Sequence, residues 1–362
     1  MPKIDALLDD LVKRGGSDLH LGAGYPPLAR IRGDLVPIRE GLVDGKELED
    51  VLHELLLPAQ RARLQANLEL DFAHSHRDTA RFRASYFTKA SGLAAVFRLV
   101  PVRVLTLAEL ACPEVLWRVA DRRSGLILVT GPGGAGKSTT VAAMLDHINK
   151  TRACHILTIE DPLEFVHEPL RAQITHREVG VHASSYAGAL ASAWRENPDV
   201  VFIGNLRGPE TTKLALELAS QGVLVFATAP TNGAAATIER LIGGFTVDQQ
   251  PQVRSLLAES LAGIVSQQLV RAADGKTRAA VHEILIGSAA VCGMIRESKT
   301  TQLANVMQSG EAVGMQTLDI GLERLLTQGR ISAEDALDRA VDREQFAQVI
   351  ARVRPDLAES LG

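Results

Sequence analysis

The first hundred residues alternate between helical periodicity and short strand-like runs. Apolar residues recur at helical spacing over 4–14, 46–57 and 58–66. Strand-like alternation, bounded by glycine and proline, occurs over 28–31, 35–38, 80–87 and 92–99. This mixture predicts a small α/β domain over 1–100, followed by a linker over 101–110.

From about residue 110 a different rhythm begins, in which short, fully apolar strands are separated by helical stretches. These strands are predicted over 126–130, 155–159, 200–204 and 224–228. The rhythm is typical of a mostly parallel sheet covered on both faces, with ligands at the carboxyl ends of its strands. After about residue 289 the pattern is helical, as over 318–327 and 333–340. We therefore predict an α/β domain over 111–289 and a helical C-terminal region over 290–362.

Composition narrows the class of protein. The chain has 362 residues, of which 46% are hydrophobic and 23% charged, as in ordinary globular proteins. No apolar run approaches the roughly 20 residues that span a bilayer. The apolar N-terminal stretch is interrupted by charges, unlike a signal peptide, so we expect a cytoplasmic protein without direct membrane insertion. A net charge of −4 gives no reason to expect a nucleic-acid partner.

The three cysteines, Cys112, Cys154 and Cys292, are far apart and form no C-x-x-C pair. This spacing indicates neither a zinc motif nor a disulfide framework. We expect these cysteines to behave as small buried hydrophobic residues.

Residues 131–138 read Gly-Pro-Gly-Gly-Ala-Gly-Lys-Ser, between a predicted strand and a predicted helix. This is the context of a phosphate-binding loop, in which glycines let successive backbone N–H groups surround an anion. The lysine would reach the β- and γ-phosphates, and the serine hydroxyl would hold Mg²⁺. The predicted nucleotide-binding residues are Gly131, Gly133, Gly134, Ala135, Gly136, Lys137, Ser138 and Thr139, with Ser138 as the magnesium ligand.

Acidic residues follow the next strand, at Glu160, Asp161 and Glu164. Carboxylates at this edge of a sheet can orient a water molecule or hold Mg²⁺; the alternative is a solvated acidic turn. The strand over 200–204 should carry a further carboxylate, but Asn205 stands there. An amide has no negative charge and cannot accept a proton, and loss of such a group costs roughly two to four powers of ten in rate.

Arg81 and Arg83 lie two residues apart on a predicted strand and therefore share one face. With Arg98 on the following strand, they could form a basic surface for a γ-phosphate. The alternative is a charged sheet face exposed to solvent.

Many motifs now add up to a resemblance over nearly the whole chain. In chain order they are Ser17-Asp18-Leu19-His20-Leu21, Pro26-Pro27, Glu69-Leu70-Asp71-Phe72, Arg81-Phe82-Arg83, Ala95-Val96-Phe97-Arg98, the phosphate loop, Thr158-Ile159-Glu160-Asp161-Pro162-Leu163-Glu164-Phe165, Arg177-Glu178-Val179-Gly180, Asn197-Pro198-Asp199-Val200 and Gly314-Met315-Gln316-Thr317-Leu318-Asp319. The chain resembles the PilT-type twitching-motility, or pilus-retraction, ATPases of the type II/IV secretion superfamily.

The resemblance implies a PAS-like N-terminal α/β domain and a RecA-like motor domain that uses ATP and Mg²⁺. It implies a homohexameric ring on the inner-membrane platform of a type IV pilus machine. It favours the retraction branch, because the four-cysteine zinc motif and extra N-terminal domains of assembly ATPases are absent from this sequence. It also implies that Glu164 positions or activates the attacking water, and that Arg81, Arg83 and Arg98 include phosphate-sensing residues.

The sequence departs from the family pattern at several sites of catalysis. Where the family reads Gly-Glu-Met-Arg-Asp, residues 204–208 read Gly-Asn-Leu-Arg-Gly, so Arg207 remains and two acids are missing. Val223 and Pro230 replace two histidines, and the signature at 290–297 lacks an arginine and an asparagine.

These losses favour a protein that binds ATP and hydrolyses it weakly, alone or in a ring mixed with a paralogous ATPase. One alternative is a fully active motor that uses Glu164 as its base. Another is a non-catalytic regulatory or scaffold subunit, and a DNA translocase is disfavoured by the acidic net charge.

Overall fold

The computed structural model describes residues 4–31, 33–76, 80–100 and 103–354. The chain forms two compact units, one of residues 1–104 with 161–166 and one of residues 105–160 with 167–362. The mixed α/β class predicted from the sequence is present in both. Parts of the predicted linker and of the C-terminal region, residues 101–102 and 355–362, lie outside the described residues.

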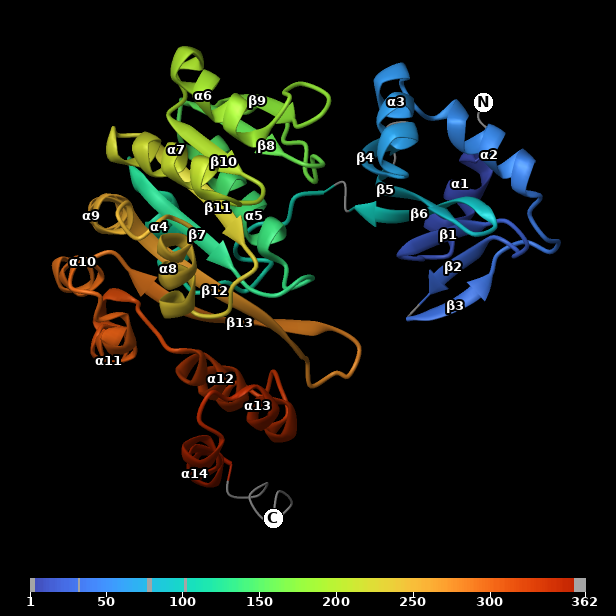
Figure 1. Cartoon of the computed structure of the whole chain (residues 1–362). Coiled ribbons are helices and arrows are strands. Elements are labelled where there is room, and N and C mark those ends of the chain that lie inside the picture. The colour runs from blue at the N-terminus through green and yellow to red at the C-terminus, as the bar shows by residue number, and fades with distance from the viewer. Residues whose placement is uncertain (1–3, 32, 77–79, 101–102, 355–362) are drawn as a thin grey trace. The chain divides into compact units, whose positions relative to one another are not determined.

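The first unit is built on an antiparallel six-stranded sheet with the order β3-β2-β1-β6-β5-β4. Its strands, drawn in blue to cyan in Figure 1, are β1 (Asp18–Gly22), β2 (Leu28–Ile31), β3 (Asp34–Pro37), β4 (Glu69–His76), β5 (Ala80–Lys89) and β6 (Gly92–Val100). Its helices are α1 (Asp5–Lys13), α2 (Gly45–Glu54) and α3 (Pro58–Asn67). Apolar residues of all three helices share one core with the sheet, so the helices cover one of its faces.

Alternation along β5 assigns its two faces. Phe82, Ala84 and Tyr86 are buried in that core, whereas Arg81 and Arg83, which alternate with them, point to the other face and are partly exposed. The strand-like alternation in the sequence therefore arises because successive side chains of β5 point alternately into the core and away from it.

The second unit contains a seven-stranded sheet with the order β13-β12-β7-β11-β10-β8-β9. Its strands are β7 (Gly125–Thr130), β8 (His155–Glu160), β9 (Gln173–Glu178), β10 (Val200–Ile203), β11 (Leu224–Ala229), β12 (Leu261–Arg271) and β13 (Arg278–Ile286). All neighbouring strands are parallel except β12 and β13. β9, β12 and β13 were not among the strands predicted from the sequence.

Helices cover both faces of this sheet. They are α4 (Val115–Ala120), α5 (Lys137–Thr151), α6 (Tyr186–Glu196), α7 (Pro209–Ser220), α8 (Ala234–Gly243) and α9 (Gln250–Ser260). Along β7, Leu126 and Leu128 pack with the core under α6–α9, whereas Ile127 and Val129 pack with the core under α4 and α5. A strand that is buried on both faces has no polar positions, which explains its uninterrupted apolar run.

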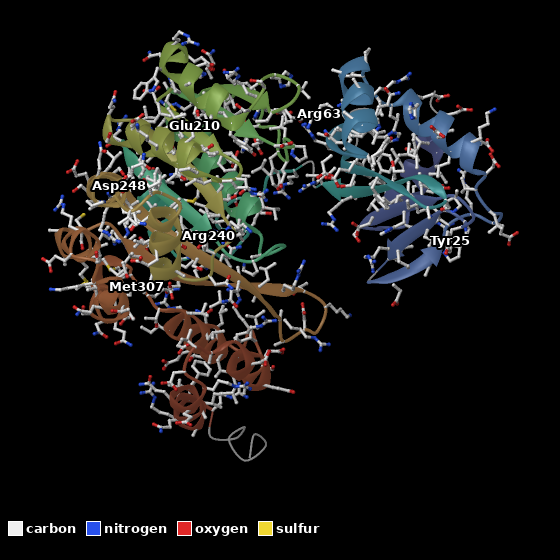
Figure 2. All side chains as sticks on the ribbon, in the orientation of Figure 1. Tyr25, Arg63, Glu210, Arg240, Asp248 and Met307 are labelled. Carbon is white, nitrogen blue, oxygen red and sulfur yellow. The ribbon has the colours of Figure 1, made fainter. Side chains whose placement is uncertain are left out.

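The C-terminal region is helical, as predicted. It consists of α10 (Ala289–Arg296), η1 (Thr300–Gln302), α11 (Leu303–Ser309), η2 (Glu311–Val313), α12 (Leu318–Thr327), α13 (Ala333–Arg339) and α14 (Arg343–Val353). Met307 of α11, labelled in Figure 2, belongs to the core under α6–α9. Helices α12–α14 pack instead against the ends of β12 and β13, through Val270 and Val281. No helix among the described residues is long and apolar enough to cross a membrane.

The three cysteines differ somewhat from the expectation of full burial. All are free thiols and only half-buried, although each packs at the margin of a core. Burial raises the pKa of Cys112 to about 12, so this thiol stays protonated at neutral pH.

Candidate nucleotide-binding site

The glycine-rich loop joins β7 to α5, the strand–turn–helix arrangement that its sequence predicts. Gly131 has φ +142°, and a Cβ atom there would lie 2.1 Å from the backbone oxygen of Gln267. Gly136, the N-cap residue immediately before α5, has φ +83°. Any other residue would therefore be strained at both positions, and at Gly131 it would also collide with β12.

The N-terminus of α5 is suited to an anion. No side chain caps this helix, and its first turn contains no acidic residue. The backbone N–H groups of an uncapped first turn carry partial positive charge and attract phosphate groups. Lys137 adds a full positive charge, and its Nζ donates hydrogen bonds to the carbonyl oxygens of Gly131, at 2.9 Å, and Pro132, at 2.8 Å. Ser138 and Thr139 occupy the same helical turn and are half-buried.

Gln267 of β12 supports the loop through side-chain hydrogen bonds, a role that was not predicted from the sequence. Its Nε2 donates to the carbonyl oxygen of Ala135 at 2.7 Å, and its Oε1 accepts from the hydroxyl of Thr140 at 2.7 Å. The side chain is 2% exposed. The polar run Ser266-Gln267-Gln268 inside a largely apolar segment was the available sequence signal.

The support continues to the C-terminal helices. Nε2 of His282, on β13, lies 3.1 Å from Oε1 of Gln267. Burial, aided by the charge of Arg330, lowers the pKa of His282 to about 4, so the ring is neutral and its Nε2–H donates. Gln316 then donates from its Nε2 to the carbonyl oxygen of His282 at 2.7 Å. The loop is thus connected by buried hydrogen bonds to the segment that precedes α12.

Acidic and amide groups meet at the carboxyl ends of β8 and β10, which are adjacent and parallel. Glu160 ends β8 and is 5% exposed, and half-buried Asn205 follows β10 after Gly204. A Cβ atom on Gly204 would lie 3.2 Å from Cγ of Glu160, so Gly204 leaves the room that the glutamate side chain occupies. The hydroxyl of Thr228 donates to the carbonyl oxygen of Gly204 at 2.5 Å and fixes this strand end.

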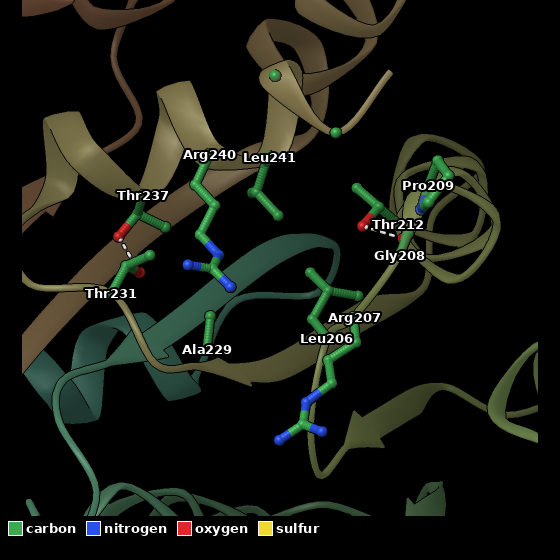
Figure 3. A pocket seen from close by; sticks show the side chains of 12 residues that line it. Leu206, Arg207, Gly208, Pro209, Thr212, Ala229, Thr231, Thr237, Arg240 and Leu241 are labelled. Carbon is green, nitrogen blue, oxygen red and sulfur yellow. Dashed lines mark hydrogen bonds between the residues drawn. The ribbon is translucent and has the colours of Figure 1, made fainter. Parts of the chain in front are cut away.

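A cavity of about 550 Å³ opens beyond the ends of β10 and β11. Figure 3 shows Arg240 reaching from α8 toward the strand that ends at Ala229, with Arg207 and Leu206 on the opposite wall. Ligands of open α/β sheets bind outside the carboxyl ends of the strands, and this cavity lies at such a place.

The three predicted arginines lie together on one face of the N-terminal sheet. The register of β5 and β6 places Arg83 directly opposite Arg98, and Arg81 shares their face. Arg83 forms an ion pair of 3.4 Å with Asp71, and Nε of Arg98 donates to Asp18 at 2.8 Å.

The environment of Asp18 keeps it ionised as the partner of Arg98. Burial disfavours the charged form of Asp18, yet hydrogen bonds from Arg98 and Ser17 hold its pKa below the usual value. Arg98 nonetheless leaves 70% of its side chain exposed.

The acidic segment is divided between the two units. Glu160 is the last residue of its stretch in the larger unit, whereas residues 161–166, with exposed Asp161 and half-buried Glu164, group with the N-terminal unit. The structure brings Glu160 close to Gly204, the residue before Asn205, and it places Asp161 and Glu164 in the same unit as the three arginines.

Comparisons with known proteins agree with this architecture. The family model described as type II/IV secretion system protein matches residues 48–353. The type IV pilus retractation ATPase PilT of Pseudomonas aeruginosa is 44% identical over 343 residues, which is 95% of this chain and 99% of the relative. A twitching motility protein of Neisseria gonorrhoeae is 45% identical over 321 residues, 89% of this chain and 86% of the relative.

A solved structure gives the same result in three dimensions. The pilus retraction motor PilT with bound ADP has a TM-score of 0.86 at 38% identity, and the match covers 95% of this chain and 98% of that one. The predicted fold class, an N-terminal α/β domain followed by a RecA-like domain with a helical C-terminal extension, is confirmed.

Proposed function

Since the chain belongs to the type II/IV secretion system protein family, we propose that it is a ring-forming, ATP-binding member of the pilus-retraction branch with slow hydrolysis. The observation that carries this proposal is the contrast between two parts of one sheet edge. The phosphate loop is complete and buttressed, whereas an amide, Asn205, stands where a carboxylate is expected.

The residues present fit ATP and Mg²⁺. The glycines of the loop, the uncapped start of α5 and the ammonium of Lys137 together form an anion site. The triphosphate would be held by the loop residues Gly131, Gly133, Gly134, Ala135, Gly136, Lys137, Ser138 and Thr139. Bound Mg²⁺, held by the hydroxyl of Ser138, would neutralise developing charge on the phosphates.

Hydrolysis needs groups that orient water and respond to the γ-phosphate. We assign the first task to Glu164, supported by buried Glu160 and by Asp161. Asn205 can hold a metal-bound water through its oxygen but contributes no charge, which is the physical reason for the slow rate. Arg207 and the arginine face of the N-terminal unit, Arg81, Arg83 and Arg98, are proposed to contact phosphate or report its presence.

The assembly proposed for this chain is a hexameric ring, formed by this chain alone or mixed with a paralogous ATPase. It would act in the cytoplasm on the inner-membrane platform of a type IV pilus machine. This part of the proposal is supported by the pilus retraction and twitching motility proteins that the chain resembles over most of its length.

The test is to measure MgATP binding and steady-state hydrolysis by the full-length protein, side by side with Asn205→Glu and Lys137→Ala. We expect the wild type to bind tightly and turn over slowly, and Asn205→Glu to raise the rate by roughly two powers of ten. Lys137→Ala should lose binding, because it removes the positive charge at the loop.

Each rival predicts a different outcome. Robust wild-type turnover that Asn205→Glu leaves unchanged and Glu164→Gln abolishes would identify a fully active motor and overturn slow hydrolysis. Binding without turnover in both the wild type and Asn205→Glu would indicate a regulatory or scaffold subunit.

A further inference from the structure

Two histidines extend the buried face of β4 in the N-terminal unit. Leu70, Phe72, His74 and His76 alternate along this strand and therefore point to one side. The first two belong to the apolar core, and the histidines continue the row at the end of the strand. His76 is 2% exposed and His74 is half-buried, with its ring edge-on to Phe97. Imidazole rings here replace the apolar side chains that such a row would otherwise contain.

Helix α1 presents two carboxylates to these rings. Asp5 and Asp9 are four residues apart and thus lie on the same face of the helix. Oδ1 of Asp5 lies 3.5 Å from Nδ1 of His76, and Oδ1 of Asp9 lies 2.8 Å from Nε2 of the same ring. One atom each of Asp5, His74 and His76 lies within 4.8 Å of the other two. Three side chains of the kinds that bind divalent metals therefore converge on one point.

The two ring nitrogens of His76 have different partners. Nε2 has the distance of a hydrogen bond to Asp9, so its proton is directed to that carboxylate. In the neutral ring the lone pair of Nδ1 then faces the group formed with Asp5 and His74. A metal-binding histidine commonly donates its second N–H to a carboxylate, which fixes the tautomer and makes the ligand more basic. Asp9 is placed to serve His76 in this way.

His74 offers the third ligand atom of the group. Its Nε2 is buried and has no hydrogen-bond partner among the described residues. A buried imidazole nitrogen without a partner costs free energy, and a metal ion would remove that cost.

We propose that Asp5, His74 and His76 bind a divalent transition-metal ion of the zinc type, with Asp9 as the positioning residue of His76. Two imidazoles and a carboxylate favour Zn²⁺ over Mg²⁺ or Ca²⁺, which prefer oxygen ligands. Small side-chain rotations would bring the three ligands to the distances of about 2.0–2.2 Å that Zn²⁺ requires. The fourth position is left for water.

Such an ion would connect α1 to the edge strand β4. Its ligands Asp5, in α1, and His74, in β4, are about 70 residues apart along the chain. The site is remote in sequence from the phosphate loop and does not depend on the proposed ATPase function. We expect it to stabilise the N-terminal unit, since a ligand that binds only the folded state stabilises it by mass action.

The rival interpretation is a purely structural ion pair in which a protonated His76 bridges Asp5 and Asp9. The two interpretations differ at His74, which the ion pair does not need. His74→Phe suits the apolar row and the neighbouring Phe97, and therefore should fold. It leaves the ion pair intact but removes a metal ligand.

The experiment uses the full-length protein, treated with a chelator, dialysed and kept free of nucleotide. It is titrated with Co²⁺, followed by visible absorption, and then with Zn²⁺ in competition; unfolding temperatures are recorded with and without Zn²⁺. We expect one ion per chain, displacement of Co²⁺ by Zn²⁺, and a higher unfolding temperature with Zn²⁺. His74→Phe should abolish all three, and Asp9→Asn should weaken affinity roughly 10- to 100-fold.

A matched control is available in the other unit. His147 lies 2.8 Å from Asp121, and this histidine–aspartate pair belongs to no group of three metal-ligating side chains among the described residues. His147→Ala should leave metal binding unchanged. Absence of stoichiometric binding by the wild type, or binding that survives His74→Phe, would overturn the proposed site and leave the ion pair as the explanation.

Discussion

Replacing Gln267 by methionine tests whether the phosphate loop depends on its support from β12. Methionine has nearly the same length and volume, so Gln267→Met removes polarity without opening a large cavity. The carbonyl of Ala135, the hydroxyl of Thr140 and Nε2–H of His282 would each lose a buried partner. Each such loss costs about 1–3 kcal/mol, but the Thr140 hydroxyl can rotate toward the backbone carbonyl one turn earlier.

We therefore expect the free energy of unfolding to fall by about 3 kcal/mol, measured by urea denaturation. The loop would also lose its fixed carbonyl at Ala135, so ADP affinity, measured calorimetrically, should fall roughly tenfold, which is about 1.4 kcal/mol. Gln268→Met is the matched control, because this neighbour points to the opposite side of β12 and is only half-buried. If Gln267→Met binds ADP and unfolds like Gln268→Met, the loop is not held by Gln267.

Three further predictions follow from other contacts. Because folding lowers the pKa of His282 from 6.5 to about 4, its contribution to stability is complete above pH 6.5 and is lost as pH falls toward 4. This loss is about 3 kcal/mol, so His282→Gln should flatten the pH dependence of urea unfolding over that range; an equally steep profile would contradict the buried neutral ring. Gly131→Ala should abolish ADP binding by its clash with Gln267, whereas Gly133→Ala, where a Cβ meets nothing within 4 Å, should bind normally. Asp319→Ala removes an acceptor of the backbone N–H groups of Val341 and Asp342, at 2.8 and 3.2 Å, and should expose residues 340–342 to limited proteolysis, whereas the exposed Asp338→Ala should not.

The parts of the fold that the sequence predicted are those with one dominant physical signal. The strand β7 is buried on both faces, so its apolar run has no competing interpretation. The loop that follows has glycines at positions where only glycine fits, such as Gly131. In contrast, β12 and β13 contain Gln267, His282 and Glu283 among their apolar residues, and these polar groups obscure the strand pattern. Their partners are distant in sequence, so no local pattern could reveal why polar residues are buried there.

The same distinction applies to the candidate site. Sequence spacing placed Arg81 and Arg83 on one face, because alternation along a strand is a local property, and the register of the hairpin adds Arg98 to that face. It could not show that Asp18 holds Arg98, or that residues 161–166 group with the N-terminal unit, because these contacts join distant segments. The roles assigned to Glu164 and Asn205 stay predictions that the kinetic comparison will decide.

The amide of Gln267 satisfies its neighbours in only one orientation, since its oxygen accepts from Thr140 and His282 while its nitrogen donates to Ala135. A substitution at any of these side chains removes the reason for the others. Positions 140, 267 and 282 should therefore change together during evolution, although they are far apart in sequence. Asn205 takes no part in these hydrogen bonds. Position 205 can therefore change independently, while the residues that support the phosphate loop are conserved or replaced together.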